Sequence, residues 1–418
     1  MNNNITPNKE KPYSIDNLAK KSKEIALEML KDTLEALDES ILNHSERKRN
    51  YYVKGIYKRT ITTLDGTITF KRRLYINKST GEYESLLDRL VGIDPYSRLS
   101  DEAIIAITDA ALECNSYRIA GMYALSGTIV SRQTVYNCLE KVDFIRTKSK
   151  EKINSECIHI SIDGFFANYK EFQRKTETKF ANIYTGIENE TPKRKKLVNK
   201  VIVNQTKSKN FKEELLSTLK DNYDINDNTK IYLCGDGAQW IKNICDDIPN
   251  SVFVIDKFHY KRALKSLPNP QEAYKAIETQ NIELIANQYS LCTTDLQLSN
   301  LQYVIANFEY TKHWKEPDFI CCAAENVVSH VYNHRIRGIP RNWGKNLYKI
   351  SLGLALKATN SFKIELTDIC DEKLLNKNKK IDDLFVSFEV DKHKSQFPLF
   401  NYKRTRTSVF IKKILYKA

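Results

Sequence analysis

The stretch KIYLCGDGAQWIK, residues 230–242, places a carboxylate between two glycines at the end of an apolar run. Residues 231–234 are typical of a buried strand, and residues 238–241 begin a helical pattern. Asp and Gly both disfavour strands, so a turn accounts for the glycines. A turn does not explain a charged group at the end of an apolar strand. In strand–helix–strand folds functional groups lie at the carboxyl ends of strands, which makes Asp236 a candidate site residue.

The flanking sequence predicts a mixed α/β domain. Three strand patterns with short connections precede the stretch, at residues 157–169, 179–189 and 196–206, and predict an antiparallel meander. Strands and helices then alternate, which favours parallel neighbours and a mixed sheet. The fourth strand of such a fold lies beside the first. The expected elements after the meander are a helix at about 210–221, strand 230–235, helix 238–247, strand 251–256 and helix 258–266.

A second carboxylate, Asp163 in HISIDGFF, lies on the first predicted strand and should approach Asp236. Two carboxylates at one apolar-walled position repel each other unless a cation lies between them. Oxygen ligands of this kind suit Mg²⁺ or Mn²⁺, and two such ions support phosphoryl transfer. The glycines beside Asp236 would then let the backbone turn away and a phosphate approach. The competing interpretation is that both acids are plain turn residues.

The charge of the chain favours a polyanionic partner. The 418 residues suffice for two or three domains, and 66 Lys and Arg against 52 Asp and Glu give a net charge of +14. The surplus is clustered at 192–196, 334–345 and 402–418. Each neutralised phosphate releases counterions, so nucleic acid fits this pattern. A merely soluble basic protein, or a lysine-rich codon bias, is the alternative.

The sequence predicts a cytoplasmic protein, associated with the nucleoid in a bacterium. The first residues lack the apolar core of a signal peptide, and no later run approaches the length of a membrane span. Nine cysteines occur without a Cys-x-x-Cys pair, which is typical of free thiols in a reducing compartment.

The N-terminal part has the features of a DNA-binding region. Residues 16–43 predict one long helix with a leucine seam that should pack on a neighbouring domain. Asp65-Gly66 predicts a β-hairpin, whose basic face would carry Arg59, Lys71, Arg72 and Arg73. Helices are expected at 101–113 and 116–145. The second region resembles a helix-turn-helix that turns at Ser126-Gly127, and its recognition helix would present Ser131, Arg132, Gln133, Thr134 and Asn137 to the DNA groove.

Four motifs together resemble a known class of enzyme. They are IDGFF at 162–166, CGDGAQWI at 234–241, IDKFHYKRAL at 255–264 and AAENVVSHVYNHRIRGIPRNWGK at 323–345. The sequence is similar to transposases with an RNase H-like catalytic domain and an Asp-Asp-Glu triad. More narrowly, it resembles the bacterial ISLre type of insertion-sequence transposase, related to Mutator-like transposases. The resemblance extends from about residue 52 to about residue 355.

The resemblance implies specific site residues. Asp163 and Asp236 match the first two catalytic acids, and Glu325 matches the third; all three would be metal ligands. Asp256 and His259 match an Asp-x-x-His element beside the site. Local alternatives exist for each: Asp256 as a helix cap, His259 as a local hydrogen-bonding group, and Glu325 as a solvated helix position.

The third acid is chosen by position among several. Glu316 and Asp318 flank Pro317 on a loop, whereas Glu325 follows the small, apolar run FICCAA, which can pack a helix closely against the sheet. Acids before about residue 315 fall in a helical insertion, about 270–315, that should cover the DNA rather than enter the site. The basic run after Glu325 would hold DNA through Arg335, Arg337 and Arg341.

The predicted layout has four parts: an N-terminal helix at 1–50, a DNA-binding region at 51–150, an RNase H-like domain at 151–360 and a basic tail at 361–418. The resemblance implies a transposase that cuts element ends and joins the freed 3′-hydroxyl to target DNA, using two Mg²⁺ or Mn²⁺ ions. Its partner is double-stranded DNA, bound by a homodimer or larger assembly. The alternatives are a nuclease or resolvase on the same fold, and a catalytically decayed DNA-binding protein.

Overall fold

The computed structural model describes residues 14–147, 151–169, 174–192, 194–205, 210–337, 342–344 and 346–367. The chain divides into two compact units. The first comprises Met1–Ala111, Tyr117–Lys141 and Leu366–Ala418, and the second comprises Leu112–Ser116 and Val142–Glu365. The basic tail predicted at 361–418 lies outside the described residues from residue 368 onward. Among the residues described, no helix is both long and apolar enough to cross a membrane.

In the first unit a long helix packs on a β-hairpin. The chain begins with helices α1 (Ile15–Asn43) and α2 (Ser45–Asn50). The hairpin follows, with strands β1 (Tyr51–Thr62) and β2 (Thr67–Asn77). The short strand β3 (Tyr83–Glu84) pairs with β2, and helix α3 (Leu86–Leu90) follows β3. The hairpin turns at Asp65-Gly66, as predicted. The leucine seam of α1 is also confirmed as a packing surface, except at Leu30, which is 39% exposed. Leu27, Leu34, Leu37 and Ile41 contact the hairpin core formed by Ile61, Ile68, Phe70 and Tyr75.

Three more helices come after α3: α4 (Asp101–Glu113), α5 (Tyr117–Tyr123) and α6 (Arg132–Glu140). The turn between α5 and α6 contains Gly127 at φ +76°, a conformation that glycine adopts without strain. Helix α6 begins after Ser131, whose Oγ accepts a hydrogen bond from the Thr134 N–H (3.1 Å), so the predicted entry point is confirmed. The predicted helical region runs too far, however, because residues after 141 form a strand.

The strand is β4 (Val142–Arg146), which pairs with β15 (Phe362–Leu366) in the chain's second half. Val142 and Phe144 are buried and alternate with exposed residues. This period of two fits a strand with one covered face rather than a helix. Phe144 stacks on Phe362, with ring centroids 5.9 Å apart, which fixes the pairing.

The main sheet of the second unit is mixed, as predicted. Its strand order is β10 (Val201–Asn204), β7 (Arg174–Tyr184), β6 (Cys157–Tyr169), β12 (Lys230–Gly235) and β13 (Ser251–Ile255). Strands β6, β12 and β13 are parallel, and β7 is antiparallel to β6 and β10. The fourth strand of the predicted series, β12, does lie beside the first, β6. The short β14 (Asn342–Trp343) pairs with the far end of β6.

The meander departs from the expected three simple strands. Between β7 and β10 the chain makes an extra hairpin, β8 (Gly186–Thr191) and β9 (Arg194–Val198), which forms its own two-stranded sheet. The second and third predicted strands are therefore each divided in two. Residues 187–191 show no buried face, so this part of the chain gains nothing from joining the central sheet. A further short pair joins β5 (Ile153–Asn154) and β11 (Tyr223–Asp224).

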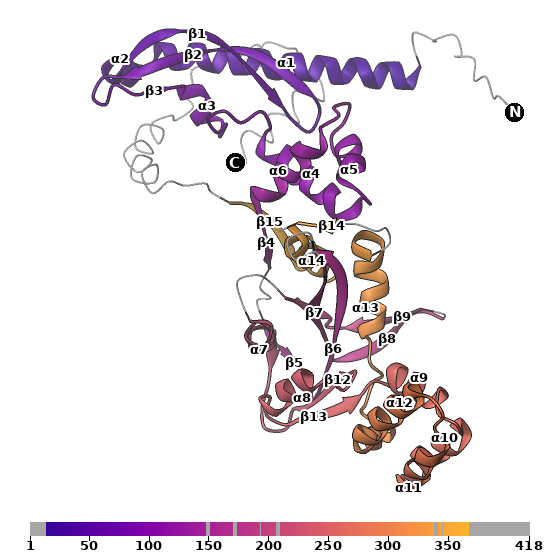
Figure 1. The fold of residues 1–418 in the computed structure, drawn as a ribbon. Coiled ribbons are helices and arrows are strands. Elements are labelled where there is room, and N and C mark those ends of the chain that lie inside the picture. Colours follow the sequence, from indigo (N-terminus) through magenta and orange to yellow (C-terminus); the bar gives the residue numbers. More distant parts are fainter. Residues whose placement is uncertain are drawn as a thin grey trace, which may run out of the picture. The chain divides into compact units, whose positions relative to one another are not determined.

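Helices cover the sheet and share its core. Helices α7 (Phe211–Asn222), α8 (Gln239–Asp246) and α9 (Lys257–Lys265) agree with prediction to within about two residues. The segment predicted as a helical insertion is helical: α10 (Pro270–Thr279), α11 (Glu283–Ala286), the 3₁₀ helix η1 (Asn287–Leu291), α12 (Asp295–Ala306) and the 3₁₀ helix η2 (Phe308–Lys315). Figure 1 shows α9 to α12 gathered beside the end of β13.

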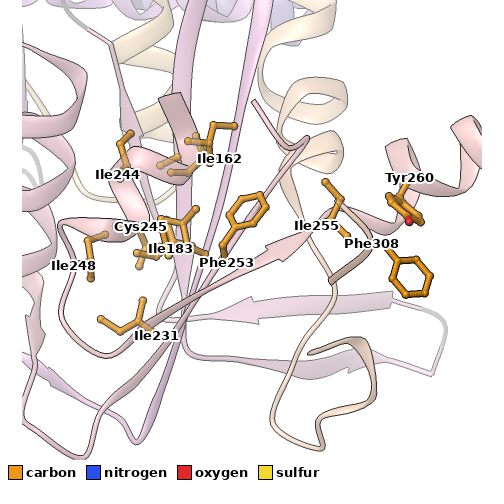
Figure 2. Packing of buried hydrophobic residues seen from close by; sticks show 14 of the residues in the cluster. Ile162, Ile183, Ile231, Ile244, Cys245, Ile248, Phe253, Ile255, Tyr260 and Phe308 are labelled. Carbon is orange, nitrogen blue, oxygen red and sulfur yellow. The ribbon is translucent and has the colours of Figure 1, made fainter. Parts of the chain in front are cut away.

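The last helices of this unit are α13 (Ala324–Val327), a π-helix η3 (Val328–Arg337) that continues it, and α14 (Asn346–Lys357). The core joins sheet residues to both α8 and the insertion. In Figure 2, side chains of β12, β13 and α8 point toward one another, and Tyr260 and Phe308 lie at the end of β13. The insertion is therefore packed into the same core as the sheet.

Candidate functional site

Three carboxylates lie level with one another on three neighbouring parallel strands: Asp236 and Asp256 follow the ends of β12 and β13, whereas Asp163 lies within the longer β6, which continues to Tyr169. Ser161 of β6 pairs with Cys234 of β12, and Gly235 of β12 pairs with Ile255 of β13. Two residues beyond the first pair come Asp163 and Asp236, and one residue beyond the second comes Asp256. The register agrees with the prediction that strand order would bring Asp163 and Asp236 together, and it adds Asp256 to them.

Each of these carboxylates accepts a hydrogen bond from a backbone N–H one or two residues further along the chain, and Asp163 does so within β6 rather than in a turn. Asp163 Oδ1 accepts from the Gly164 N–H (2.7 Å), Asp236 Oδ1 from the Ala238 N–H (3.0 Å) and Asp256 Oδ1 from the Phe258 N–H (3.2 Å). Asp256 is therefore the N-cap of α9, as its local interpretation predicts. The second oxygens of the first two acids accept no hydrogen bond from any described residue, and they remain available to a ligand.

Residues from three separate segments meet at this edge. Asp163 from β6, His259 from α9 and Glu325 from α13 place one donor atom each within 4.8 Å of one another. Asp163 and His259 are partly exposed, and Glu325 is exposed, so the group is open to solvent. Asp236 is outside this trio, but its charge acts on Asp163. His259 Nε2 also lies 3.7 Å from Asp256 Oδ2.

The electrostatics of the site favour a cation. Burial raises the pKa of Asp163 to about 6; the hydrogen bond from Gly164 and the His259 charge act against the rise, and Asp236 and Glu325 add to it. Burial likewise raises the pKa of Asp256. Carboxylates held together without enough positive charge resist ionisation, and a divalent ion would relieve that cost. The donor set of two carboxylates and one imidazole fits Mn²⁺ well, and its oxygens fit Mg²⁺.

A second group of possible ligands lies beside the first, at Cys234, Asp256 and Cys322. Burial raises the pKa of the Cys234 thiol well above its usual value. A protonated thiol is a poor metal ligand, and sulfur is a poor match for a hard ion. The carboxylate group at Asp163 is therefore the better candidate for Mg²⁺ or Mn²⁺.

The segment that leads into Glu325 is fastened to β6 and β7 by polar side chains. The Ile320 N–H donates to His159 Nε2 (3.1 Å), the Tyr184 hydroxyl donates to the Cys321 carbonyl (2.8 Å), and the Ala323 N–H donates to Ser161 Oγ (3.0 Å). His159 is stacked between Tyr184 and Tyr232, at centroid distances of 5.4 and 5.3 Å. Burial lowers the pKa of His159, which keeps the imidazole neutral.

Sequence reasoning missed these positioning residues, although the pattern that reveals them is visible. In residues 158–163, isoleucines alternate with His159, Ser161 and Asp163. Such alternation assigns the isoleucines to the apolar core and the three polar residues to the opposite face of β6. The isoleucines are indeed fully buried in the core. The polar face then receives the segment before α13.

Glu316 and Asp318, the competing candidates for the third acid, lie elsewhere. Glu316 accepts hydrogen bonds from Lys230 Nζ and the Tyr232 hydroxyl, both at 2.5 Å, and pairs with His313 Nδ1 at 2.5 Å. Although burial alone would raise its pKa, these three partners hold it at about 2. Glu316 is thus committed to a structural network. The backbone carbonyl of Asp318 lies 3.0 Å from His159 Nε2, the nitrogen that accepts the Ile320 N–H.

The glycines of the opening stretch make room for protein rather than for a ligand. A Cβ on Gly235 would lie 2.8 Å from Ile241 Cδ1, so the glycine lets α8 pack against the strand end. Gly237 has φ +92°, and a Cβ there would lie 2.7 Å from Asn307 Oδ1. The expected space for a phosphate at these glycines is therefore filled.

The insertion also reaches the site, contrary to the expectation that it would only cover DNA. The Tyr303 hydroxyl of α12 donates to the Asp236 carbonyl (2.8 Å). Because α12 belongs to the core that it shares with the sheet, it supports the turn that carries Asp236.

Three of the four residues of the predicted basic hairpin face are neutralised within the protein, and the fourth, Lys71, is exposed. Arg72 Nε lies 2.8 Å from Asp88 Oδ1, and Arg59 pairs with the same carboxylate at 3.8 Å. Arg73 pairs with Asp38 at 2.8 Å and with Glu39 at 2.6 Å. The three arginine side chains are only 13–15% exposed. They hold α1 and α3 to the hairpin and do not form an open phosphate-binding face; the sequence could not show this because their acidic partners come from other segments.

Other predicted DNA contacts have mixed outcomes. Arg335 is buried, with 2% of its surface exposed, so it cannot contact DNA in this arrangement. Arg341 and the side chain of Arg337 lie outside the described residues. On α6, Arg132, Gln133 and Asn137 are exposed, while the Ser131 hydroxyl is occupied in capping the helix. Gln133 Nε2 donates to Asn137 Oδ1 (2.8 Å), which places both on one face.

Comparison with known proteins identifies the family. The sequence pattern of the Uncharacterised protein family (UPF0236) matches residues 14–363. A UPF0236 protein of Caldanaerobacter subterraneus subsp. tengcongensis is 25% identical over 372 residues, covering 84% of this chain and 80% of the relative. Another from that organism is 25% identical over 351 residues, covering 80% of this chain and 74% of the relative. The chain belongs to the UPF0236 family.

Proposed function

We propose that this protein is a DNA transposase with an RNase H-like catalytic domain, cutting the ends of an insertion sequence and joining them to target DNA. The observation that carries the proposal is the meeting of Asp163, His259 and Glu325 beside Asp236 at one edge of a mixed sheet. The strand order, with the fourth predicted strand beside the first, is what the resemblance to Asp-Asp-Glu transposases implies.

The relatives add independent support. The name of one UPF0236 protein of Caldanaerobacter subterraneus subsp. tengcongensis joins eleven designations, and the name of another from that organism joins four. A gene present in many copies in one organism is what a mobile element produces. The net charge of +14 also suits a protein whose substrate is DNA.

Each residue has a role in the proposed reaction. Asp163, Asp236 and Glu325 would hold the divalent ions, which when bound activate a nucleophile and stabilise a leaving oxygen. His259 brings a nitrogen donor to the same point. The backbone N–H groups of Gly164 and Ala238 each bind one carboxylate oxygen, of Asp163 and Asp236 respectively. The second oxygen of each carboxylate is therefore already oriented for a metal ion, and little side-chain entropy is lost when the ion binds. The reaction is in-line phosphodiester transfer, first to water and then to a 3′-hydroxyl.

The test uses the purified full chain, Mg²⁺ and duplex DNA that contains the sequences flanking its own gene. We expect nicks at fixed positions and joined products with a second duplex. Asp236→Asn should abolish both while DNA binding in a gel-shift assay stays within about twofold, because Asn keeps the shape but loses the charge that holds the metal. Asp227→Asn, at an exposed acid in the loop before β12, is the matched control.

Each outcome separates the proposal from its alternatives. Cleavage by Asp236→Asn at near the wild-type rate would remove Asp236 from the site. Cleavage without joined products would indicate a nuclease or resolvase. Binding without any cleavage by the unaltered protein would indicate a DNA-binding protein that has lost catalysis.

A further inference from the structure

The first unit contains a cavity of about 560 Å³ that is separate from the acidic site. Its lining comes from one strand, β1, and from the loop after α3. Three cations, two threonines and one tyrosine line it, and no acid does: Lys58, Arg59, Thr60, Thr62, Tyr96 and Arg98.

The loop wall of this cavity is fastened to β1. Arg59 Nη2 donates to the Ser97 carbonyl (2.6 Å) and to the Asp94 carbonyl (3.1 Å). The Thr62 N–H donates to the Arg98 carbonyl (2.9 Å), and the Ser100 N–H donates to the Thr62 carbonyl (2.9 Å). Arg59 is thus used to build the wall, and the cavity is formed before any ligand arrives.

Tyr96 has two features that are unfavourable for a tyrosine: a left-handed backbone conformation and an almost fully exposed side chain. Its φ is +62°, in the left-handed region, and 95% of its surface is exposed. The Ser97 N–H donates to the Asp94 carbonyl (3.1 Å), so Tyr96 is the third residue of a turn whose second is Pro95. That position favours glycine. Backbone strain of this kind concentrates at ligand-binding sites, and here it presents an aromatic ring beside the cavity.

The charges of the lining are available to a ligand. Lys58 and Arg98 are exposed and make no ion pair with any described residue, unlike Arg59, which faces Asp88. Thr60 and Thr62 add hydroxyls, each shared with a threonine of β2 at 2.8 Å. An aromatic platform flanked by two open cations and hydroxyls matches a nucleobase with its adjoining phosphates.

We propose that this cavity binds an unpaired nucleotide of DNA, with the base stacked on Tyr96 and the phosphates next to it bound by Lys58 and Arg98. The inference rests on the proposed function in taking DNA as the partner. It adds that the protein holds a single-stranded end or an extruded base at a second place, apart from the acidic site.

The experiment measures binding of fluorescently labelled DNA to the full chain in EDTA, so that no cleavage occurs. A blunt duplex is compared with the same duplex carrying a four-nucleotide single-stranded overhang. Tyr96→Gly relieves the left-handed strain, so it should fold at least as well as the unaltered protein in a melting assay. We expect it to weaken overhang binding about tenfold and to leave blunt-duplex binding unchanged. Tyr96→Phe should keep the preference for the overhang.

Controls and contrary outcomes are built into the same assay. Tyr289→Ala, which removes another exposed tyrosine, should have no effect on the preference. Unchanged overhang binding by Tyr96→Gly, or an equal loss on both duplexes, would overturn the inference. Competition by a free mononucleotide as strong as that by the overhang would overturn it as a DNA site. This binding assay does not measure cleavage. A failure to cleave DNA in the separate cleavage assay would therefore count against the proposed function and not against DNA binding by this cavity.

Discussion

The backbone N–H of Ala323 donates a hydrogen bond to Ser161 Oγ (3.0 Å). This bond joins the strand that carries Asp163 to the segment that carries Glu325. Ser161 precedes Asp163 by two residues on β6, and Ala323 precedes Glu325 by two residues at the start of α13. Glu325 is itself exposed, so its place depends on how the segment before it is docked. One strand therefore positions both ends of the candidate metal-binding group.

Ser161→Ala should weaken metal binding although it changes none of the candidate metal ligands. The variant leaves the buried Ala323 N–H without its acceptor, at a cost of about 1–3 kcal/mol. We expect a lower melting temperature, weaker Mn²⁺ binding by calorimetry and slower cleavage, with DNA binding unchanged. Ser217→Ala, at an exposed position of α7, is the control. A loss of stability with Mn²⁺ affinity intact would mean that Ser161 does not position Glu325.

Glu316→Gln and Glu325→Gln should have opposite effects. The folded pKa of Glu316, about 2, is depressed below its ordinary value, so its network stabilises the fold above about pH 4.5 and is lost as the pH falls toward 2. Glu316→Gln should therefore cost about 1–2 kcal/mol at pH 7, after discounting for solvent screening, and less than half of that at pH 3. Cleavage below its melting temperature should persist.

Glu325→Gln should leave the melting curve in EDTA unchanged, because the side chain is exposed, and should lose both cleavage and joining. The two variants therefore control for each other. If Glu316→Gln loses cleavage while Glu325→Gln retains it, the third metal ligand belongs to the loop at 316–318.

The strands could be predicted because they depend on short-range pattern, and the alignment of Asp163 with Asp236 followed from the expected strand order, with the fourth strand beside the first. Alternation and apolar runs located β6 and β12, and parallel pairing then brought Asp163 beside Asp236. What could not be predicted depends on long-range partners. The hairpin arginines looked free because Asp38 and Asp88 are distant in sequence, and Arg335 looked exposed because its burial is set by packing within the second unit.

The same limit applies to the candidate site. Glu325 could be preferred over Glu316 only by position, since nothing local to Glu316 reveals its pairing with Lys230 and Tyr232. The departure of β8 and β9 from the central sheet was likewise hidden, because their strand pattern continues that of their neighbours.

Asp163→Asn should stabilise the metal-free protein at neutral pH. The folded pKa of Asp163, about 6, is above its unfolded value, so the carboxylate costs stability once it ionises. The cost is absent below about pH 4, grows between pH 4 and 6, and is complete above pH 6. We expect a gain of about 2–3 kcal/mol at pH 7 in EDTA and none at pH 4.

Metal addition provides the converse measurement. Mg²⁺ or Mn²⁺ should raise the melting temperature of the unaltered protein at pH 7 and have little effect on Asp163→Asn. Asp32→Asn, at an exposed position of α1, should behave as the unaltered protein in both conditions. A lower melting temperature for Asp163→Asn at pH 7 in EDTA would show that the carboxylate is not under electrostatic strain.

Arg132→Ala should reduce recognition of the element's ends more than it reduces total DNA binding. Arg132 is exposed at the first position of α6, where a recognition helix contacts base edges, and Gln133 and Asn137 share its exposure. Loss of a base contact should cost about 1–3 kcal/mol on the end sequence and little on random DNA of equal length, both read by competition binding at fixed salt. Arg49→Ala removes an exposed positive charge from α2 and is the control for charge alone. An equal loss on both DNAs would assign Arg132 to the phosphates, and no loss on either would remove α6 from the interface.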